Sequence, residues 1–164
     1  KTVAKTDGPV FIRTGRAKVP VIYTPDQQFT IGKAVELVDG HDVTIIAHGL
    51  MVAEAIRAAE MLENEGVSAR VIDMFTVKPV DRDAIAKAAA DTRAIVVAEE
   101  HLLDSGLGVR VAQTAAETNP CVMEFVGINN TYAESATPDQ LLDKYGLRAI
   151  NVAAAARSAI ARKR

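Results

Sequence analysis

Apolar runs alternate with amphipathic segments along most of the chain. Val43 to Ala47 is apolar on both faces, as a buried parallel strand requires. The next segment, Val52 to Glu65, places its apolar residues on one helical face and its charged residues elsewhere. Further strands are predicted over Arg70 to Phe75, Ala94 to Ala98 and Val122 to Val126, with helices around Ile85 and over Val109 to Thr118. This alternation predicts right-handed βαβ units and a mostly parallel sheet covered on both faces.

Capping residues mark where these helices begin and end. Asp81 is suited to cap the helix that contains Ile85, and Gly66 stands where a left-handed C-cap is needed. Thr137-Pro138 has the pattern of an N-cap followed by proline at the first helical position, with Gly146 beyond the helix end. We expect Asn151 to open a final alanine-rich helix.

The N-terminal segment has a different character. The run Val10-Phe11-Ile12 predicts a strand, and a lone strand of this length needs partners in a sheet. Ala17 to Phe29 contains Pro20 and Pro25, which indicates an extended linker. We therefore place a domain boundary near residue 26, with residues 1–25 as a terminal strand plus linker and residues 26–164 as an α/β domain.

Composition restricts the class of protein. The 164 residues suffice for one domain, and a hydrophobic fraction of 49 % is enough for a core built from Val, Ile, Leu and Ala. The formal net charge is −2, with no basic stripe for nucleic acid and no apolar run long enough to span a membrane. The single cysteine, Cys121, is interpreted as a small apolar filler. These features predict a cytoplasmic protein, and a chain that starts at Lys1 suggests a fragment.

Polar residues follow the predicted strands, where ligands of open α/β sheets usually lie. These residues are His48, Thr76, Glu99, Glu100 and His101. Histidines and carboxylates can form acid/base or metal sites, but no His-x-x-x-His or Cys-x-x-Cys spacing is present. We interpret them as loop hydrogen-bonding groups and predict no metal site. Gly106-Leu107-Gly108 lacks the third glycine of a dinucleotide fingerprint and is interpreted as a tight turn into a helix, rather than an anion site.

Two arginines form the main candidate binding site. Arg13 and Arg16 follow the apolar run and are separated by Thr14-Gly15. Two guanidinium groups at a strand end can hold a phosphate or carboxylate through forked, charge-assisted hydrogen bonds. The alternative is that both are surface residues that solvate a linker, and the residues themselves favour neither interpretation.

Several motifs, in order and spacing, resemble the C-terminal part of transketolases. They are Gly8-Pro9-Val10-Phe11-Ile12-Arg13-Thr14-Gly15-Arg16, Asp42 to Ala47 with Gly49, Arg70 to Asp81, Glu99-Glu100-His101 with Gly106-Leu107-Gly108, Glu134-Ser135 with Thr137-Pro138, and Lys144-Tyr145-Gly146-Leu147. The resemblance extends over nearly the whole chain and identifies residues 1–25 with the end of a pyrimidine-binding domain. It implies a three-layer α/β/α sandwich of about five strands, mostly parallel, in which Lys33 to Val38 runs antiparallel.

The resemblance also implies a function. Transketolases use thiamine diphosphate and magnesium to move a two-carbon ketol unit between sugar phosphates, and they act as homodimers. Arg16 matches the family arginine that binds the sugar phosphate, with Arg13 as its neighbour. The cofactor and catalytic residues belong to domains outside this chain, so we expect no catalytic residue here and no cofactor bound by this chain alone. Its expected partners are the remaining transketolase domains or an N-terminal section.

Three other functions stay open at this point. Deoxyxylulose phosphate synthase and the beta subunit of a 2-oxo acid dehydrogenase belong to the same superfamily. Thr76-Val77-Lys78-Pro79 and Tyr145-Gly146-Leu147 favour transketolase over both. A non-catalytic, freestanding module for small-ligand binding or dimerisation is the third possibility, and the unpaired N-terminal strand argues against it.

Overall fold

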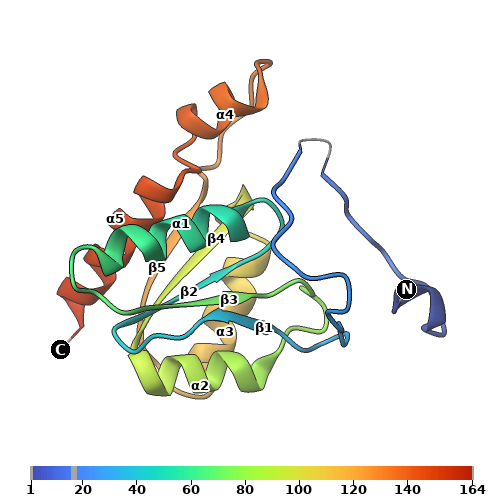
Figure 1. Ribbon diagram of the computed structural model, residues 1–164, viewed down its shortest axis with the longest axis horizontal. Helices are drawn as coiled ribbons and strands as arrows, with labels where there is room; N and C mark the ends of the chain where they lie inside the picture. The colour runs from blue at the N-terminus through green and yellow to red at the C-terminus, as the bar shows by residue number, and fades with distance from the viewer. Residues whose placement is uncertain (1, 16–17, 164) are drawn as a thin grey trace.

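A five-stranded sheet forms the centre of the protein (Figure 1). The computed structural model describes residues 2–15 and 18–163. The strands lie in the order β1-β3-β2-β4-β5, where β1 is Val35–Val38, β2 is Val43–Ala47, β3 is Ala69–Asp73, β4 is Ala94–Leu102 and β5 is Val122–Ile128. Strand β1 pairs antiparallel with β3, and the other neighbours pair in parallel. The predicted mixed sheet with one antiparallel strand is confirmed.

Helices cover both faces of this sheet, as predicted for a three-layer sandwich (Figure 1). Their bounds are Met51–Glu63 for α1, Arg82–Thr92 for α2, Leu107–Glu117 for α3, Pro138–Lys144 for α4 and Ala149–Arg162 for α5. Successive side chains of a strand point to opposite faces, and β2 shows the consequence. Ile45 belongs to the core cluster with α1 and α5, whereas Ile46 belongs to the cluster with α2 and α3. The sheet therefore separates two hydrophobic cores, one on each face.

The helix ends largely follow the predicted caps. The Asp81 side chain accepts a hydrogen bond from the backbone N–H of Ala84, and Thr137 forms a reciprocal capping box with Gln140. The final helix begins at Ala149, two residues before the predicted start at Asn151. The reason is tertiary, because the Ala149 N–H donates to the buried Glu54 carboxylate on α1 at 2.7 Å.

Strand β4 is longer than predicted. The sequence indicated an end at Ala98, but pairing with β5 resumes between Leu102 and Ile128 after a register shift. The polar residues Glu99, Glu100 and His101 therefore lie on the strand instead of in a following loop. This extension places Glu99 beside the end of β2.

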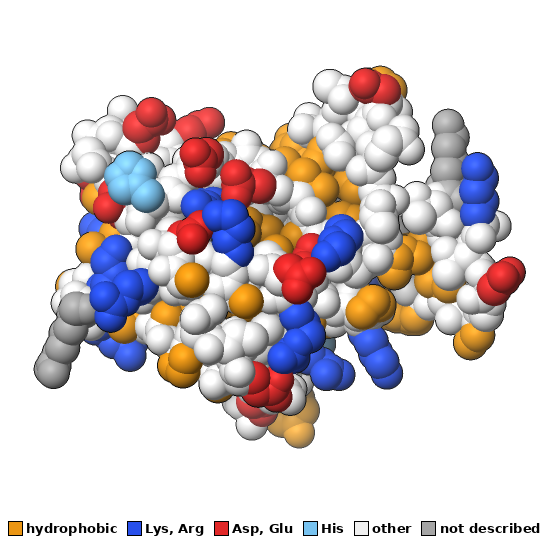
Figure 2. Space-filling view, turned by 90° about the horizontal axis from the view of Figure 1, so that it is seen from below, with side chains coloured by type: hydrophobic (Ala, Val, Ile, Leu, Met, Phe, Trp, Pro, Cys, Tyr) orange, Lys and Arg blue, Asp and Glu red, His pale blue; other side chains and the backbone are white. Residues whose placement is uncertain are grey.

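The segment before β1 is an extended arm, and its described residues contain one short 3-10 helix, Val3–Lys5, and no strand. The predicted strand at Val10-Phe11-Ile12 is not formed here, because no neighbouring strand supplies hydrogen-bond partners. Phe11 is 89 % exposed and Val21 is 92 % exposed. Its assignment to the sheet of a neighbouring domain stays a prediction. Figure 2 shows hydrophobic side chains exposed at many places on the face that it presents, with acidic and basic groups intermixed among them.

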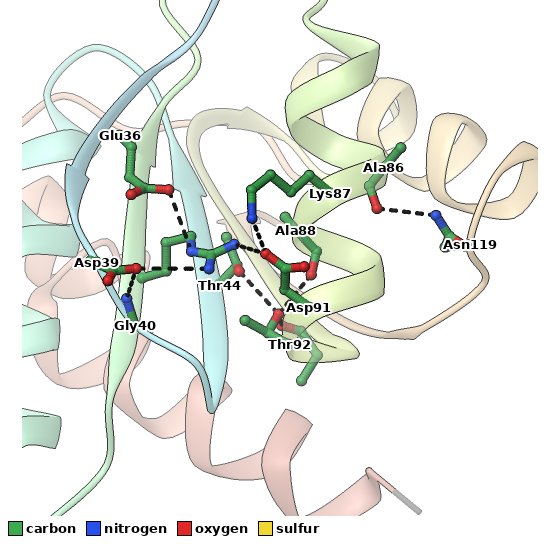
Figure 3. Close-up of polar contacts among 12 residues, drawn as sticks. Glu36, Asp39, Gly40, Thr44, Ala86, Lys87, Ala88, Asp91, Thr92 and Asn119 are labelled. Carbon is green, nitrogen blue, oxygen red and sulfur yellow. Dashed lines mark hydrogen bonds and ion pairs between the residues drawn. The ribbon is translucent and has the colours of Figure 1, made fainter.

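An ion-pair cluster around the buried Arg70 side chain joins β3 to α2 and to the β1 segment, at the end of β3 remote from Asp73 (Figure 3). The Arg70 guanidinium is 8 % exposed and lies 2.9 Å from Asp91, 3.4 Å from Glu36 and 3.8 Å from Asp39. Lys87 also pairs with Asp91. Since three carboxylates already surround Arg70, we interpret this cluster as a contact that holds β3, α2 and the β1 segment together.

Candidate functional site at the carboxyl edge of the sheet

The carboxyl ends of three adjacent strands bring a set of polar side chains together. Ala47, the last residue of β2, pairs with Asp73 on one side and with Ala98 on the other. His48 therefore follows β2 between Asp73 on β3 and Glu99 on β4. This is the edge where open α/β sheets usually bind ligands.

Glu99 is only 2 % exposed, and its side chain caps the start of helix α3. Its Oε2 accepts a hydrogen bond from the Leu107 N–H at 2.9 Å, and its Oε1 accepts one from the Gly108 N–H at 2.7 Å. His48 Nε2 lies 3.6 Å from Oε2. Burial by itself raises the pKa of Glu99, but His48 and the two backbone N–H groups outweigh it and lower the pKa below its ordinary value.

Gly106, just before α3, and Gly108, the second residue of α3, allow this close approach. Gly106 has φ +81°, and a Cβ at this position would lie 2.4 Å from Glu99 Oε2. A Cβ at Gly108 would lie 3.2 Å from Oε1. The predicted tight turn is confirmed, and the helix N-terminus that was the alternative anion site already holds the protein's own carboxylate.

Asp73 is bound by the N-terminal arm. It is 5 % exposed, and its Oδ2 accepts a hydrogen bond from the Tyr23 hydroxyl at 2.5 Å. Burial raises the pKa of Asp73, although the Tyr23 hydrogen bond and the nearby His48 oppose this shift. Burial also raises the pKa of Tyr23, and the Asp73 carboxylate raises it further. The sequence analysis identified neither residue, although an acidic residue within a predicted buried strand was a detectable signal.

Tyr23, Phe29 and Phe75 form a row of three aromatic rings. The Tyr23 and Phe29 rings meet edge to face at 4.9 Å, and Phe29 and Phe75 do so at 5.0 Å. Phe75 follows β3, whereas the other two rings belong to the linker. The linker is therefore attached to the carboxyl edge through both polar and apolar contacts.

The structure describes one of the two candidate arginines, Arg13. Arg13 Nη2 donates to the Glu100 carboxylate at 3.1 Å and to the Glu100 carbonyl oxygen at 3.3 Å. Both side chains of this ion pair are about half exposed, at 48 % and 43 %. Arg16 lies outside the described residues. Whether the two arginines share a ligand stays a prediction.

Thr76 and His101, near the same edge, form hydrogen-bonding contacts, as predicted. His101 Nδ1 lies 3.3 Å from Ser105 Oγ, and Thr76 Oγ1 accepts a hydrogen bond from the Gly32 N–H. Burial raises the pKa of the Cys121 thiol, which disfavours the nucleophilic thiolate.

Within residues 2–15 and 18–163, no group of three or more histidine, cysteine or acidic side chains is arranged to hold a metal ion. No helix in the described parts is long and apolar enough to cross a membrane.

Comparisons with known proteins show where similar chains occur. Residues 32–152 match a family model described as the C-terminal domain of transketolase. The chain is 41 % identical over 157 residues to a 6-deoxy-6-sulfo-D-fructose transketolase subunit of Clostridium sp. (strain MSTE9), covering 96 % of this chain and 49 % of the relative. It is 44 % identical over 140 residues to an apulose-4-phosphate transketolase subunit of Phocaeicola vulgatus, covering 85 % of this chain and 45 % of the relative.

A solved structure shares the fold throughout. It is described as a split gene transketolase in an inactive beta4 tetramer, with a TM-score of 0.95 and 47 % sequence identity. The alignment covers 98 % of this chain and 53 % of that one. The chain thus spans about half the length of the relatives that it matches.

Proposed function

This chain belongs to the family of transketolase C-terminal domains, and on that basis we propose that it is the C-terminal section of an enzyme that transfers a two-carbon ketol unit between sugar phosphates. Thiamine diphosphate with magnesium is the proposed cofactor of the complete enzyme. The observation that carries the proposal is the family match over residues 32–152, combined with relatives that are transketolase subunits of about twice the length.

The exposed arm supports the existence of further domains. Its apolar residues include Phe11 at 89 %, Ile12 at 60 % and Val21 at 92 % exposure. Leaving such side chains in water forgoes about 1.5–3 kcal/mol for each large residue that a partner would bury. A neighbouring pyrimidine-binding domain, with Val10 to Ile12 as one of its strands, would remove this exposure.

The described residues do not fit the cofactor. They offer no group of three metal ligands, and the helix N-terminus that suits a diphosphate is filled by Glu99. We therefore propose that the catalytic step takes place on the other domains of the complete enzyme. When bound elsewhere in the complete enzyme, thiamine diphosphate would supply the carbanion stabilisation that ketol transfer needs, and this chain would supply scaffold and substrate contacts.

Arg16 is the proposed contact to the anionic end of the sugar, with Arg13 beside it. The Arg13–Glu100 ion pair is half exposed, and such pairs contribute about 0–1 kcal/mol, so a substrate anion can replace the carboxylate at small cost. The two relatives are named for sugars that carry a sulfo group and a phosphate group, respectively. We propose that the sugars used by the complete enzyme here also end in such an anion.

Assembly completes the proposed site. We propose a homodimer of complete protomers, each built from this section and the thiamine-binding portion. The solved relative that forms an inactive beta4 tetramer is consistent with a chain that assembles with itself yet needs a further part for activity. Mass photometry of the reassembled enzyme measures this directly, and a stable single protomer with full activity would contradict the dimer.

Reassembly of the enzyme from its two parts tests the proposed function. The chain, produced together with the thiamine-binding portion of its own protein, should transfer ketol units between phosphorylated sugars, and neither part alone should do so. The matched control omits thiamine diphosphate. Activity of this chain alone would overturn the proposal, and consumption of a 2-oxo acid with release of carbon dioxide would favour a synthase or dehydrogenase instead.

A further inference from the structure

The carboxyl edge of the domain contains an incomplete buried group. Asp73 is only 5 % exposed. Its Oδ1 has no hydrogen-bond partner among the described residues. Its Oδ2 accepts a hydrogen bond from the Tyr23 hydroxyl, which comes from the arm 50 residues earlier. A buried carboxylate without a donor is strongly disfavoured. The domain therefore depends on the arm to satisfy Asp73.

Among the described residues, the Tyr23 hydroxyl is the one hydrogen-bond donor to the Asp73 side chain. His48, between Asp73 and Glu99, lies 3.6 Å from Glu99 Oε2. Glu99 in turn is held by the two N–H groups at the start of α3. The pairing of β3 with β2 sets the position of Asp73, and the arm brings the hydroxyl donor to it.

Several contacts hold the arm along this edge. Tyr23 and Phe29 stack edge to face, and Phe29 stacks in the same way on Phe75 of the domain. Closer to the N-terminus, Arg13 reaches Glu100 on β4. Tyr23 lies between these two anchor points and makes the most buried polar contact.

We propose that Tyr23 and Asp73 form a latch that sets the path of the linker over the carboxyl edge, and thereby the position of Arg13 relative to the sheet. Tyr23 and Asp73 are positioning residues, because neither is proposed to touch the substrate. The part of this proposal that concerns substrate rests on the proposed function. The latch itself is a property of this chain and is tested separately.

Spin labels on the full chain test the latch. With Cys121→Ser as background, labels at Lys18→Cys on the linker and Arg110→Cys on α3 report the distance between linker and domain; both positions are exposed. Tyr23→Phe keeps the ring stack and removes the hydroxyl, so the distance distribution should broaden clearly. The matched control is Tyr132→Phe, because Tyr132 is 99 % exposed. Equal widths for Tyr23→Phe and Tyr132→Phe would refute the latch.

Substitutions at Asp73 provide a second readout. Asn retains an oxygen that accepts from the Tyr23 hydroxyl, whereas Leu has a similar size and no acceptor. Asp73→Asn should therefore keep the narrow distribution, and Asp73→Leu should broaden it like Tyr23→Phe. Broad distributions for both, or narrow ones for both, would contradict a hydrogen-bonded latch.

Kinetics of the complete enzyme test the positioning role. Tyr23→Phe should raise KM for phosphorylated sugars about ten-fold, the factor expected when a displaced arginine loses one charge-assisted hydrogen bond to the substrate anion. It should leave kcat, and KM for short unphosphorylated substrates, nearly unchanged. Equal effects on both substrate classes would refute the positioning role. If Arg16→Ala has no selective effect but the labels still respond to Tyr23→Phe, the substrate-site assignment fails and the latch stands.

Discussion

Glu99→Gln is the substitution that best tests the interpretation of the carboxyl edge. Glutamine has nearly the same shape as glutamate but has one acceptor oxygen and one NH2 group. In the native protein, each Glu99 oxygen accepts from a different N–H, those of Leu107 and Gly108. The variant can satisfy only one of them, and its NH2 group must face the other donor.

The magnitude follows from the lost contacts. A hydrogen bond to a charged group contributes about 1.5–3 kcal/mol, and a buried donor left unsatisfied costs about 1–3 kcal/mol, two values that partly overlap. The lost charge at the start of α3 removes about 0.3–1 kcal/mol more. Relief of the buried charge offsets part of this loss. We therefore expect a destabilisation of about 2–4 kcal/mol, a large share of the roughly 5–15 kcal/mol typical of a domain.

Urea unfolding of the full chain near pH 7 measures this change. Glu117→Gln is the control, because Glu117 is exposed, is the last residue of α3 and pairs with Arg82. This control substitution should leave the unfolding midpoint almost unaltered. A loss below about 1 kcal/mol for Glu99→Gln would refute the reasoning, since it is less than one charged hydrogen bond.

The same pair of proteins has a defined pH dependence. The folded-state pKa of Glu99 is lowered from its ordinary value of 4.5. The ionised group therefore stabilises the fold above that pH, and this contribution disappears as the pH falls through the lowered folded-state pKa. The difference between native chain and Glu99→Gln should be largest near neutral pH and shrink below about pH 4.5. A difference that grows on acidification would contradict the assignment.

Three further predictions concern other parts of the chain. Arg70→Met should destabilise the domain by about 1–3 kcal/mol in urea unfolding, because the three carboxylates around Arg70 would lose their shared cation; a variant as stable as the native chain would contradict the role of this cluster. Calorimetry of this chain with thiamine diphosphate and magnesium should detect no binding, and one tight site per chain would overturn the proposed division between domains. In the complete enzyme, Arg16→Ala should weaken the use of phosphorylated sugars roughly ten- to a hundred-fold and Arg16→Lys should restore part of it; equal losses with unphosphorylated substrates would make Arg16 a structural residue.

The periodicity of the sequence was sufficient to predict the layered architecture. A run such as Val43 to Ala47 has no polar face, and such a strand is stable only in the middle of a sheet covered on both sides. Local capping signals at Asp81 and Thr137 also worked, because each acts on N–H groups within three residues. The antiparallel direction of β1 came from the family resemblance, since periodicity does not specify strand direction.

Tertiary structure decided the contents of the carboxyl edge. Tyr23 and Asp73 are 50 residues apart, and only the order β3-β2-β4 brings Asp73, His48 and Glu99 side by side. The extension of β4 beyond Ala98 depends on its pairing with β5. Sequence patterns report whether a residue prefers burial, but the partner of a buried polar group is chosen by which strands become neighbours. For this reason the fold of this protein was readable from its sequence, whereas the latch between its arm and its domain was not.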